Sequence, residues 1–173
     1  MGTDKRIVIA AVAVVAVLLQ VMLAPYIAIM GIVPNLVAVA AVIMAVVRPD
    51  RIGCIVPFLM GLFFDLFSGN AVGPMAFTLT LTTFLAARLY IALNNDTALM
   101  AILVAVAALL MTEIMYGLFM VFLGYDAGVL GALAYRALPI FLYDFVLTIV
   151  LFLPLRRLLA VTAPVQSSIT RLR

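Results

Sequence analysis

The chain has 173 residues, of which 69% are hydrophobic and 10% are charged. An ordinary soluble domain has about 45–50% apolar and about 25% charged residues, and a mean hydropathy of +1.39 leaves too few polar side chains to cover a surface in water. The composition therefore excludes a soluble fold and predicts an all-α integral membrane protein. Because one span takes about 20 apolar residues, the length allows about six spans and excludes a large catalytic domain outside the membrane.

The residue types that bind metals and form disulfides are nearly missing from the sequence. It has no histidine and a single cysteine, Cys54. This excludes the usual zinc, iron–sulfur and disulfide patterns, and we expect no metal, haem or other cofactor. The net charge of +3, from ten Lys and Arg against seven Asp and Glu, is typical of membrane topology and does not indicate nucleic-acid binding.

Six apolar runs are separated by charges or by clusters of Pro, Gly and Asn. They are Ile7–Ala24, Ile27–Val47, Ile52–Phe67, Met75–Leu93, Thr97–Gly124 and Ala137–Leu155. The first run follows two basic residues like a signal peptide, but it is too long, and Pro25 directly follows the one plausible cleavage position. We therefore expect a retained first span, one membrane-embedded domain over residues 1–163 and a short cytoplasmic tail over residues 164–173.

The positive charges predict the topology. With a cytoplasmic N-terminus, nine of the ten lie on the inner side and only Arg136 falls in an outer loop. The inner ones are Lys5, Arg6, Arg48, Arg51, Arg88, Arg156, Arg157, Arg171 and Arg173. Since Lys and Arg are retained on the cytoplasmic side, we expect a six-transmembrane-helix bundle with both termini cytoplasmic. A five-span topology would place the last four arginines outside.

The second and third runs contain residues that shorten helices. Pro34 and Asn35 interrupt the second run, and proline is best tolerated in the first turn of a helix. A helix that begins at Pro34 covers about 21 Å of a core that is about 30 Å thick, and residues 26–33 become a separate short piece, re-entrant or at the outer interface. The third run has Pro57 in its first turns and ends at Ser68–Gly69. Two short neighbouring helices predict a thinned or cavity-bearing half.

Three carboxyl groups lie within apolar runs, at Asp65, Glu113 and Asp144. Counted from the inner charges, they lie at depths of about 21, 25 and 18 Å, and Asn35 and Gln20 at about 20 and 21 Å. Ionisable side chains at such depth are costly and mark functional sites by default. The sequence thus predicts a polar layer in the outer half of the membrane.

Two interpretations of this layer stay open, and the first is favoured. The polar groups either form hydrogen bonds between helices, worth about 0.6 kcal/mol each, or line a site or proton path. Arg136, at the outer start of the last span, is the only nearby cation, and its pairing with Asp65 or Asp144 would lower the cost of burial. Asp65 lies near a helix C-terminus, where negative charge is disfavoured. We therefore expect either that something other than helix stability retains it or that it forms a hydrogen bond to the Ser68–Gly69 turn.

Two motifs resemble a known family. Pro34-Asn35-Leu36 precedes Gly61-Leu62-Phe63-Phe64-Asp65-Leu66-Phe67-Ser68-Gly69, which is followed by Gly73. The rod shape-determining protein MreD family has a similar Pro-Asn/Asp-Leu before a Gly-x-x-x-Asp-x-x-Ser-Gly-x-x-x-Gly pattern. The resemblance is concentrated in residues 34–73, with Pro57 where glycine is expected, and the latter half is similar in hydropathy.

The resemblance implies a non-enzymatic component of the bacterial cell-elongation (rod) complex in the inner membrane. Such a protein maintains rod shape by binding MreC, a bitopic scaffold, and links MreB to peptidoglycan synthesis by RodA and its penicillin-binding transpeptidase. Its surroundings are membrane lipid, no nucleic acid is expected, and a homodimer stays open. The candidate partner or polar-layer residues are Pro34, Asn35, Asp65, Ser68, Gly69, Glu113, Arg136 and Asp144.

Two other functions compete with this one. The layout of six spans with both ends inside is also similar to the substrate-binding membrane subunits of energy-coupling factor transporters, in which the polar layer would face a ligand. A proton-coupled carrier would use Asp65, Glu113 and Asp144. The carrier is less favoured, because a lone carrier of six short spans without internal repeats is unusual.

Overall fold

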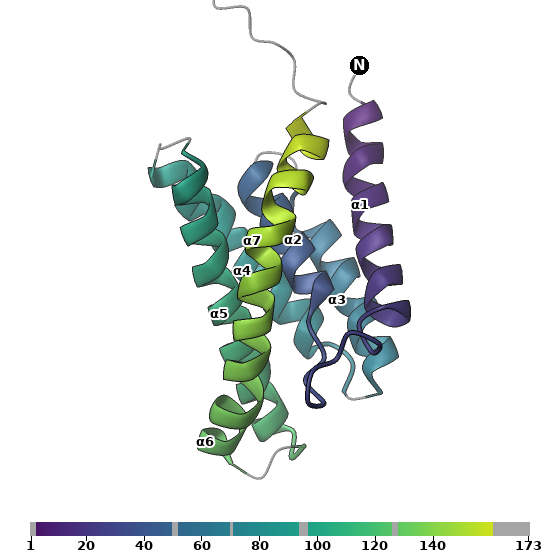
Figure 1. Cartoon of the computed structure of the whole chain (residues 1–173), viewed down its shortest axis with the longest axis vertical. Helices are drawn as coiled ribbons and strands as arrows, with labels where there is room; N and C mark the ends of the chain where they lie inside the picture. The colour runs from purple at the N-terminus through teal and green to yellow at the C-terminus, as the bar shows by residue number, and fades with distance from the viewer. Residues whose placement is uncertain (1–2, 50–51, 70, 94–96, 126–127, 161–173) are drawn as a thin grey trace, which may run out of the picture.

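The computed structural model describes residues 3–49, 52–69, 71–93, 97–125 and 128–160, and these residues form a helical bundle (Figure 1). Its elements are α1 (Thr3–Met22), α2 (Leu36–Val47), α3 (Ile55–Ser68), α4 (Pro74–Leu93), α5 (Ala98–Phe122), α6 (Val129–Gly131), the π-helical segment η1 (Ala132–Ala137) and α7 (Leu138–Ala160). Since α6, η1 and α7 follow one another without a break, the described residues form six helices, and the all-α prediction is confirmed. The predicted tail, 164–173, lies outside the described residues.

The helices differ in length, as the proline positions predict. Three are long and apolar enough to cross a membrane: Pro74–Leu93, Ala98–Phe122 and Val129–Leu159. The described parts of the other three are shorter apolar helices: Arg6–Met22, Leu36–Val47 and Ile55–Ser68. With 12 and 14 residues, α2 and α3 extend about 18 and 21 Å. The chain is thus a multi-pass membrane protein with two markedly short helices.

Helix α2 lies at the centre of the bundle. It contacts α1, α3, α4, α5 and α7, and every residue from Leu36 to Val46 is buried. Its sequence, Leu-Val-Ala-Val-Ala-Ala-Val-Ile-Met-Ala-Val-Val, is apolar on all sides, as expected of a helix enclosed by others. Because α2 starts only at Leu36, the segment before it is free to fold as turns, with a single bridge between Ile29 and Ile32.

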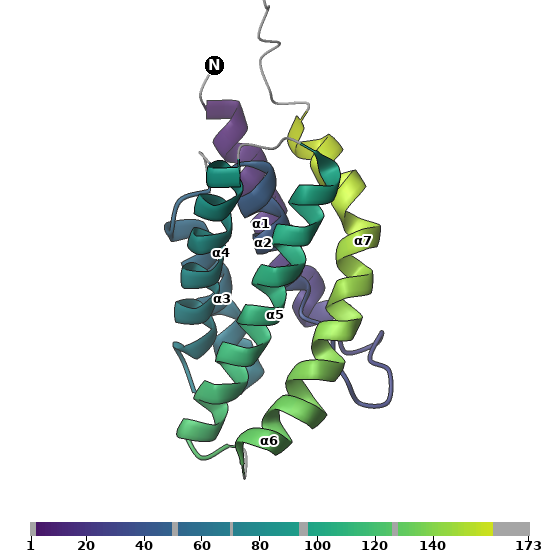
Figure 2. The ribbon, with the colours of Figure 1, turned by 90° about the vertical axis from the view of Figure 1, so that its left-hand side faces the viewer.

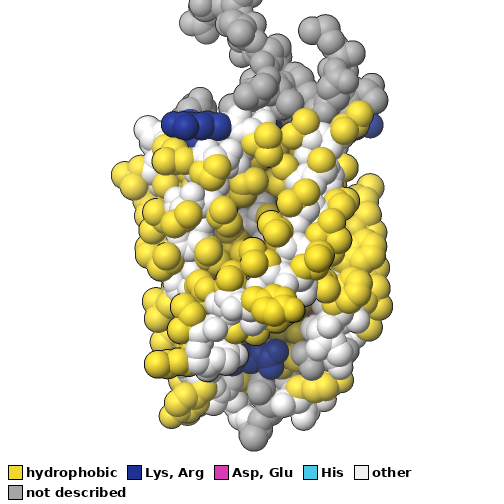
Figure 3. Space-filling model, turned by 45° about the vertical axis from the view of Figure 1, so that its right-hand side comes forward, with side chains coloured by type: hydrophobic (Ala, Val, Ile, Leu, Met, Phe, Trp, Pro, Cys, Tyr) yellow, Lys and Arg dark blue, Asp and Glu magenta, His cyan; other side chains and the backbone are white. Residues whose placement is uncertain are grey.

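The two ends of the bundle differ in charge. Figures 1 and 2 place the N-terminus and the end of α7 at one end, and α6 with the α3–α4 connection at the other. The described arginines at the first end are Arg6, Arg48, Arg88, Arg156 and Arg157, whereas Arg136 lies toward the second. Figure 3 shows hydrophobic side chains over most of the flank, with basic side chains at one rim and in a hollow toward the opposite end.

The start of the last helix differs from the prediction. Arg136 was expected in an outer loop before a span starting at Ala137, but the helix begins at Val129 and Arg136 lies within η1. The residues from Val129 to Tyr135 are helix-compatible and contain no break. Pro139 has no N–H to donate to the carbonyl of residue 135, and a wider π turn accommodates this loss.

Candidate functional site

The Asp65 carboxylate caps the neighbouring helix α4. Asp65 is 1% exposed, and its Oδ2 accepts hydrogen bonds from the backbone N–H groups of Gly73 (2.9 Å), Met75 (3.0 Å) and Ala76 (3.1 Å). Helix α4 starts at Pro74, which has no N–H. The carboxylate therefore satisfies every N–H of a first turn that has no intrahelical partner, and its charge faces the positive end of the helix dipole.

The expected hydrogen bond between Asp65 and the Ser68–Gly69 turn is present, and it involves the backbone of Asp65. The Ser68 hydroxyl donates to the backbone carbonyl of Asp65 (2.9 Å), so the turn contacts the main chain while the Asp65 side chain bonds to α4. Gly69 ends α3 in the left-handed conformation, with φ of 71°, as predicted for a glycine stop. The interaction of Asp65 outside its own helix is thus the capping of α4.

Gly61 allows α3 and α4 to approach closely. It lies one turn before Asp65, and an added Cβ would be 2.6 Å from the Cα of Ala76 and 2.7 Å from the carbonyl oxygen of Met75. No side chain larger than hydrogen fits there without moving the backbone of α4. The Gly-x-x-x-Asp-x-x-Ser-Gly pattern therefore specifies a tightly packed helical hairpin.

A second polar cluster forms around Asn35, at the start of α2. The Asn35 side chain caps α2 by accepting from the N–H of Ala38 (3.0 Å). Its Nδ2 donates to Glu113 Oε1 of α5 (3.1 Å), and its backbone N–H donates to Asp144 Oδ1 of α7 (2.8 Å). All three polar residues are buried. One residue thus connects the central helix to two long helices that are distant in the chain.

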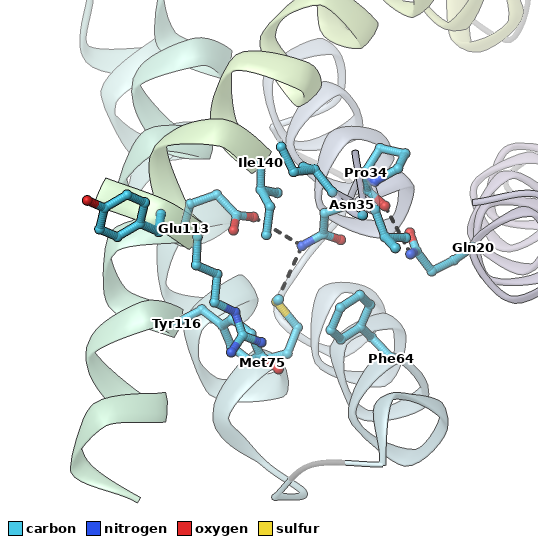
Figure 4. A pocket seen from close by; sticks show the side chains of 13 residues that line it. Gln20, Pro34, Asn35, Phe64, Met75, Glu113, Tyr116 and Ile140 are labelled. Atoms are coloured by element: carbon cyan, nitrogen blue, oxygen red, sulfur yellow. Dashed lines mark hydrogen bonds between the residues drawn. The ribbon is translucent and has the colours of Figure 1, made fainter. Parts of the chain in front are cut away.

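Gln20 and Met75 extend this cluster toward α1 and α4. Gln20 Nε2 donates to the carbonyl of Pro34 (3.0 Å), and Gln20 Oε1 accepts from the N–H of Val37 (3.4 Å). Figure 4 shows Asn35 between Glu113 and the sulfur of Met75, which lies 4.0 Å from Asn35 Nδ2. The structure therefore joins four of the five predicted layer residues in one network, and places Asp65 beside it in a separate capping site.

A pocket opens next to this network. It has a volume of about 280 Å³, and its polar lining includes Gln20, Asn35, Glu113, Tyr135 and Arg136. The Arg136 guanidinium lies 5.5 Å from the centroid of the Tyr116 ring and interacts electrostatically with the carboxyl group of Glu113. The pocket thus presents a positive and a negative side chain at the depth of the polar layer.

The sequence did not indicate two further polar contacts that position these helices. The Tyr143 hydroxyl donates to the carbonyl of Ile27 (2.7 Å) and holds the turn segment against α7. The hydroxyls of Thr82 and Thr112 lie 2.8 Å apart and link α4 to α5. The only sequence feature that could have indicated the Tyr143 contact is its position next to Asp144. For the two threonines, the sequence showed only that they lie in apolar helices.

The described residues offer hydrogen bonds, close helix contacts and a charged pocket, and they form no recognisable catalytic constellation. Among the described residues, no group of three His, Cys, Asp or Glu could hold a metal ion. The Asp144 Oδ2 atom is buried and has no hydrogen-bond partner within the described parts of the chain. These features suit a protein that positions helices within the membrane.

Comparison with known proteins identifies the family. No curated protein and no solved structure matches the chain. A family model described as rod shape-determining protein MreD matches residues 1–162, so the similarity extends through the second half of the chain and includes all three carboxyl groups of the layer. The chain belongs to the MreD family of non-enzymatic, shape-determining membrane proteins.

Proposed function

We propose that this chain is the inner-membrane adaptor of a bacterial rod complex, in which it binds MreC and links MreB to peptidoglycan synthesis by RodA and its penicillin-binding transpeptidase. Membership of the family implies a role in rod-shape determination and a place in the MreBCD complex. The family match over residues 1–162 is the observation that carries the proposal. The described residues are almost all helical, so binding has to use helix faces and short connections.

The groove between α1 and α7 is the proposed docking surface for the membrane span of MreC. Its volume is about 320 Å³, its lining is apolar, and α2 contributes Leu36 and Ala40 to it. Ala11, Ala16 and Ala40 are small side chains on its walls, and small residues allow a partner helix to approach closely in lipid. A single apolar span matches this chemistry.

The proposed orientation places both termini in the cytoplasm. The arginine-rich end of the bundle contains the N-terminus and the end of α7 (Figure 1), and the excess of Lys and Arg favours the cytoplasmic side. A reporter that is active only in the cytoplasm, fused after Arg173, should be active. Activity of a periplasmic reporter at the same position would refute the six-span orientation.

The central experiment is depletion of the protein in a rod-shaped bacterium, combined with affinity purification. We expect rounded cells and co-purification of MreC from the undepleted strain in mild detergent. Normal shape with lost uptake of a small metabolite would overturn the proposal and favour the transporter-subunit alternative.

Two adjacent valines of α1 provide a matched pair of variants for the docking surface. Val15 lines the α1–α7 groove and is 52% exposed, whereas Val14 lines the opposite side of α1 and is 57% exposed. Val15→Trp should reduce the recovery of MreC because the indole fills the groove, and Val14→Trp should leave the recovery unchanged. Equal recovery in both variants, or a loss only with Val14→Trp, would contradict this docking surface.

A further inference from the structure

One oxygen of the buried Asp144 carboxyl group has no hydrogen-bond donor. The side chain is 0% exposed, and its Oδ1 atom accepts a hydrogen bond from the backbone N–H of Asn35 (2.8 Å). Its Oδ2 atom is buried and has no partner within the described parts of the chain. An ionised carboxylate would share its negative charge between both oxygens, and a buried charge without partners is costly. The surroundings of Asp144 therefore suit a neutral group.

A second carboxyl group lies in the same buried cluster. Asn35 donates its backbone N–H to Asp144 and its side-chain Nδ2 to Glu113 Oε1 (Figure 4), so one residue holds both carboxyl groups. Glu113 acts electrostatically on Asp144, and Arg136 acts electrostatically on Glu113. The guanidinium is thus a counter-charge for Glu113. An ionised Asp144 would add a second negative charge to this cluster, and repulsion between like charges disfavours it.

The other ionisable groups around α7 do not change this balance. Helix α7 contacts α2, α5 and η1, and α2 consists only of apolar residues. The described ionisable residues of α5, η1 and α7 besides Asp144 are Glu113, Tyr116, Tyr135, Arg136, Tyr143, Arg156 and Arg157. The last two follow Asp144 by 12 and 13 positions in the chain, about 18–20 Å along the helix, at the arginine-rich end of the bundle. The charged residues of α1 lie at that same end (Figure 1).

We propose that Asp144 binds one proton and functions as a neutral carboxylic acid inside the membrane. The proton comes from the aqueous phase and forms an O–H bond at Oδ2, while Oδ1 continues to accept the N–H of Asn35. Glu113 stays ionised beside Arg136, so the charges of the cluster balance. The bound proton stabilises the junction of α2, α5 and α7, and its release at high pH places two negative charges there and weakens the junction.

Infrared spectroscopy of the full-length protein in mild detergent detects this proton, because a protonated carboxyl group absorbs at a higher frequency than an ionised one. At neutral pH, exposed carboxyl groups are ionised. We expect a protonated-carboxyl band in the unchanged protein, its loss in Asp144→Asn and its retention in Asp65→Asn. Asp65 is the matched control, since it is also buried but accepts hydrogen bonds from backbone N–H groups of α4. Absence of the band from the unchanged protein, its persistence in Asp144→Asn or its loss in Asp65→Asn would overturn the proposal.

Isotope labelling assigns the band without any variant. Glu113 is the one glutamate of the sequence, and the other acidic residues are aspartates. A heavier carbon isotope in the aspartate carboxyl groups, introduced by cell-free synthesis, should shift the band to lower frequency. The same isotope in the glutamate carboxyl group should leave the band in place, and the reverse result would overturn the proposal by placing the proton on Glu113. This measurement keeps the test valid even if Asp144→Asn fails to fold.

The pH dependence of unfolding tests the effect of the proton on the helix junction. In the unfolded chain, an exposed aspartate ionises above a pH of about 4, whereas the folded chain keeps its proton at Asp144. The folded state then binds one proton more, so its stability falls as the pH rises through this range. The unfolding equilibrium constant should rise by up to about tenfold per pH unit, and Asp144→Asn should remove this contribution. An identical pH dependence of both proteins would overturn the proposal.

A metal cation at Asp144 is the alternative occupant, and salt exchange identifies it. At constant ionic strength and neutral pH, replacement of sodium chloride by the chloride of a large organic cation should leave the stability unchanged. A loss of stability in the organic salt that is absent from Asp144→Asn would indicate a bound sodium ion and overturn the assignment of a proton.

Discussion

Removal of the Asp65 carboxylate tests whether this residue is required to cap α4. In Asp65→Ala, the N–H groups of Gly73, Met75 and Ala76 lose their acceptor. The hydrogen bonds to Met75 and Ala76 are buried, and the one to Gly73 is partly buried. Water or lipid cannot replace these bonds easily, because Gly61 holds α3 directly against this turn.

The expected loss in the free energy of unfolding follows from the number of backbone N–H groups that lose their hydrogen-bond acceptor. Each buried, unsatisfied donor costs about 1–3 kcal/mol, and the loss of an N-cap alone costs about 1 kcal/mol. For two buried donors, we expect Asp65→Ala to lower the free energy of unfolding by about 3 kcal/mol. Asp65→Asn keeps one acceptor oxygen and loses the charge, which is worth up to about 2 kcal/mol at a helix N-terminus, so we expect a loss of about 1–2 kcal/mol.

The assay is reversible unfolding in mixed detergent micelles, followed by circular dichroism, with Ser68→Ala as the control. The Ser68 hydroxyl bonds to the Asp65 carbonyl in the same turn and leaves the capping bonds intact, so its loss should cost no more than about 1 kcal/mol. Wild-type stability of Asp65→Ala would refute the capping argument. If Asp65→Ala and Asp65→Asn lowered the free energy of unfolding equally, the contribution assigned to the acceptor oxygen that Asn retains would be refuted.

Three further variants test the rest of the polar layer and its packing. Gly61→Ala should cost about 1–3 kcal/mol because its Cβ overlaps the α4 backbone, whereas Gly117→Ala, whose Cβ has no neighbour nearer than 3.8 Å, should be neutral in the same unfolding assay. Asn35→Ala should lower stability by about 2 kcal/mol, since it removes the cap of α2 and the bond to α5; a loss below that of Ser68→Ala would contradict a central role. Tyr143→Phe should cost about 1 kcal/mol and increase proteolysis of the 23–35 segment, and unchanged proteolysis would argue against its contact with Ile27.

Helix number and helix ends followed from local signals. An apolar run of about 20 residues forms a helix in lipid, because its backbone groups have no other partners there. Pro34 and Asn35 indicated the late start of α2, and Ser68–Gly69 indicated the end of α3. Arg136 is the exception, because a charged side chain alone does not end a helix and the π turn before Pro139 lets the helix continue through it.

The position of each polar residue along its own helix was predictable, but the direction of its side chain was not. Depth depends only on the rise per residue, whereas direction depends on how each helix is rotated against its neighbours. The pairing of Arg136 with Asp65 or Asp144 was considered on depth alone. In the structure, Asp65 faces the first turn of α4, and Arg136 acts electrostatically on the Glu113 carboxyl group.

Composition and proline placement are therefore sufficient to establish a lipid-embedded helical chain with two short helices, because these properties depend on neighbouring residues and on the solvent. The capping of α4 by Asp65 and the hydrogen bonds of Asn35 to Glu113 and Asp144 depend on packing between residues that are up to 109 positions apart. Helix rotation and close approach set these contacts, and both are properties of the assembled bundle.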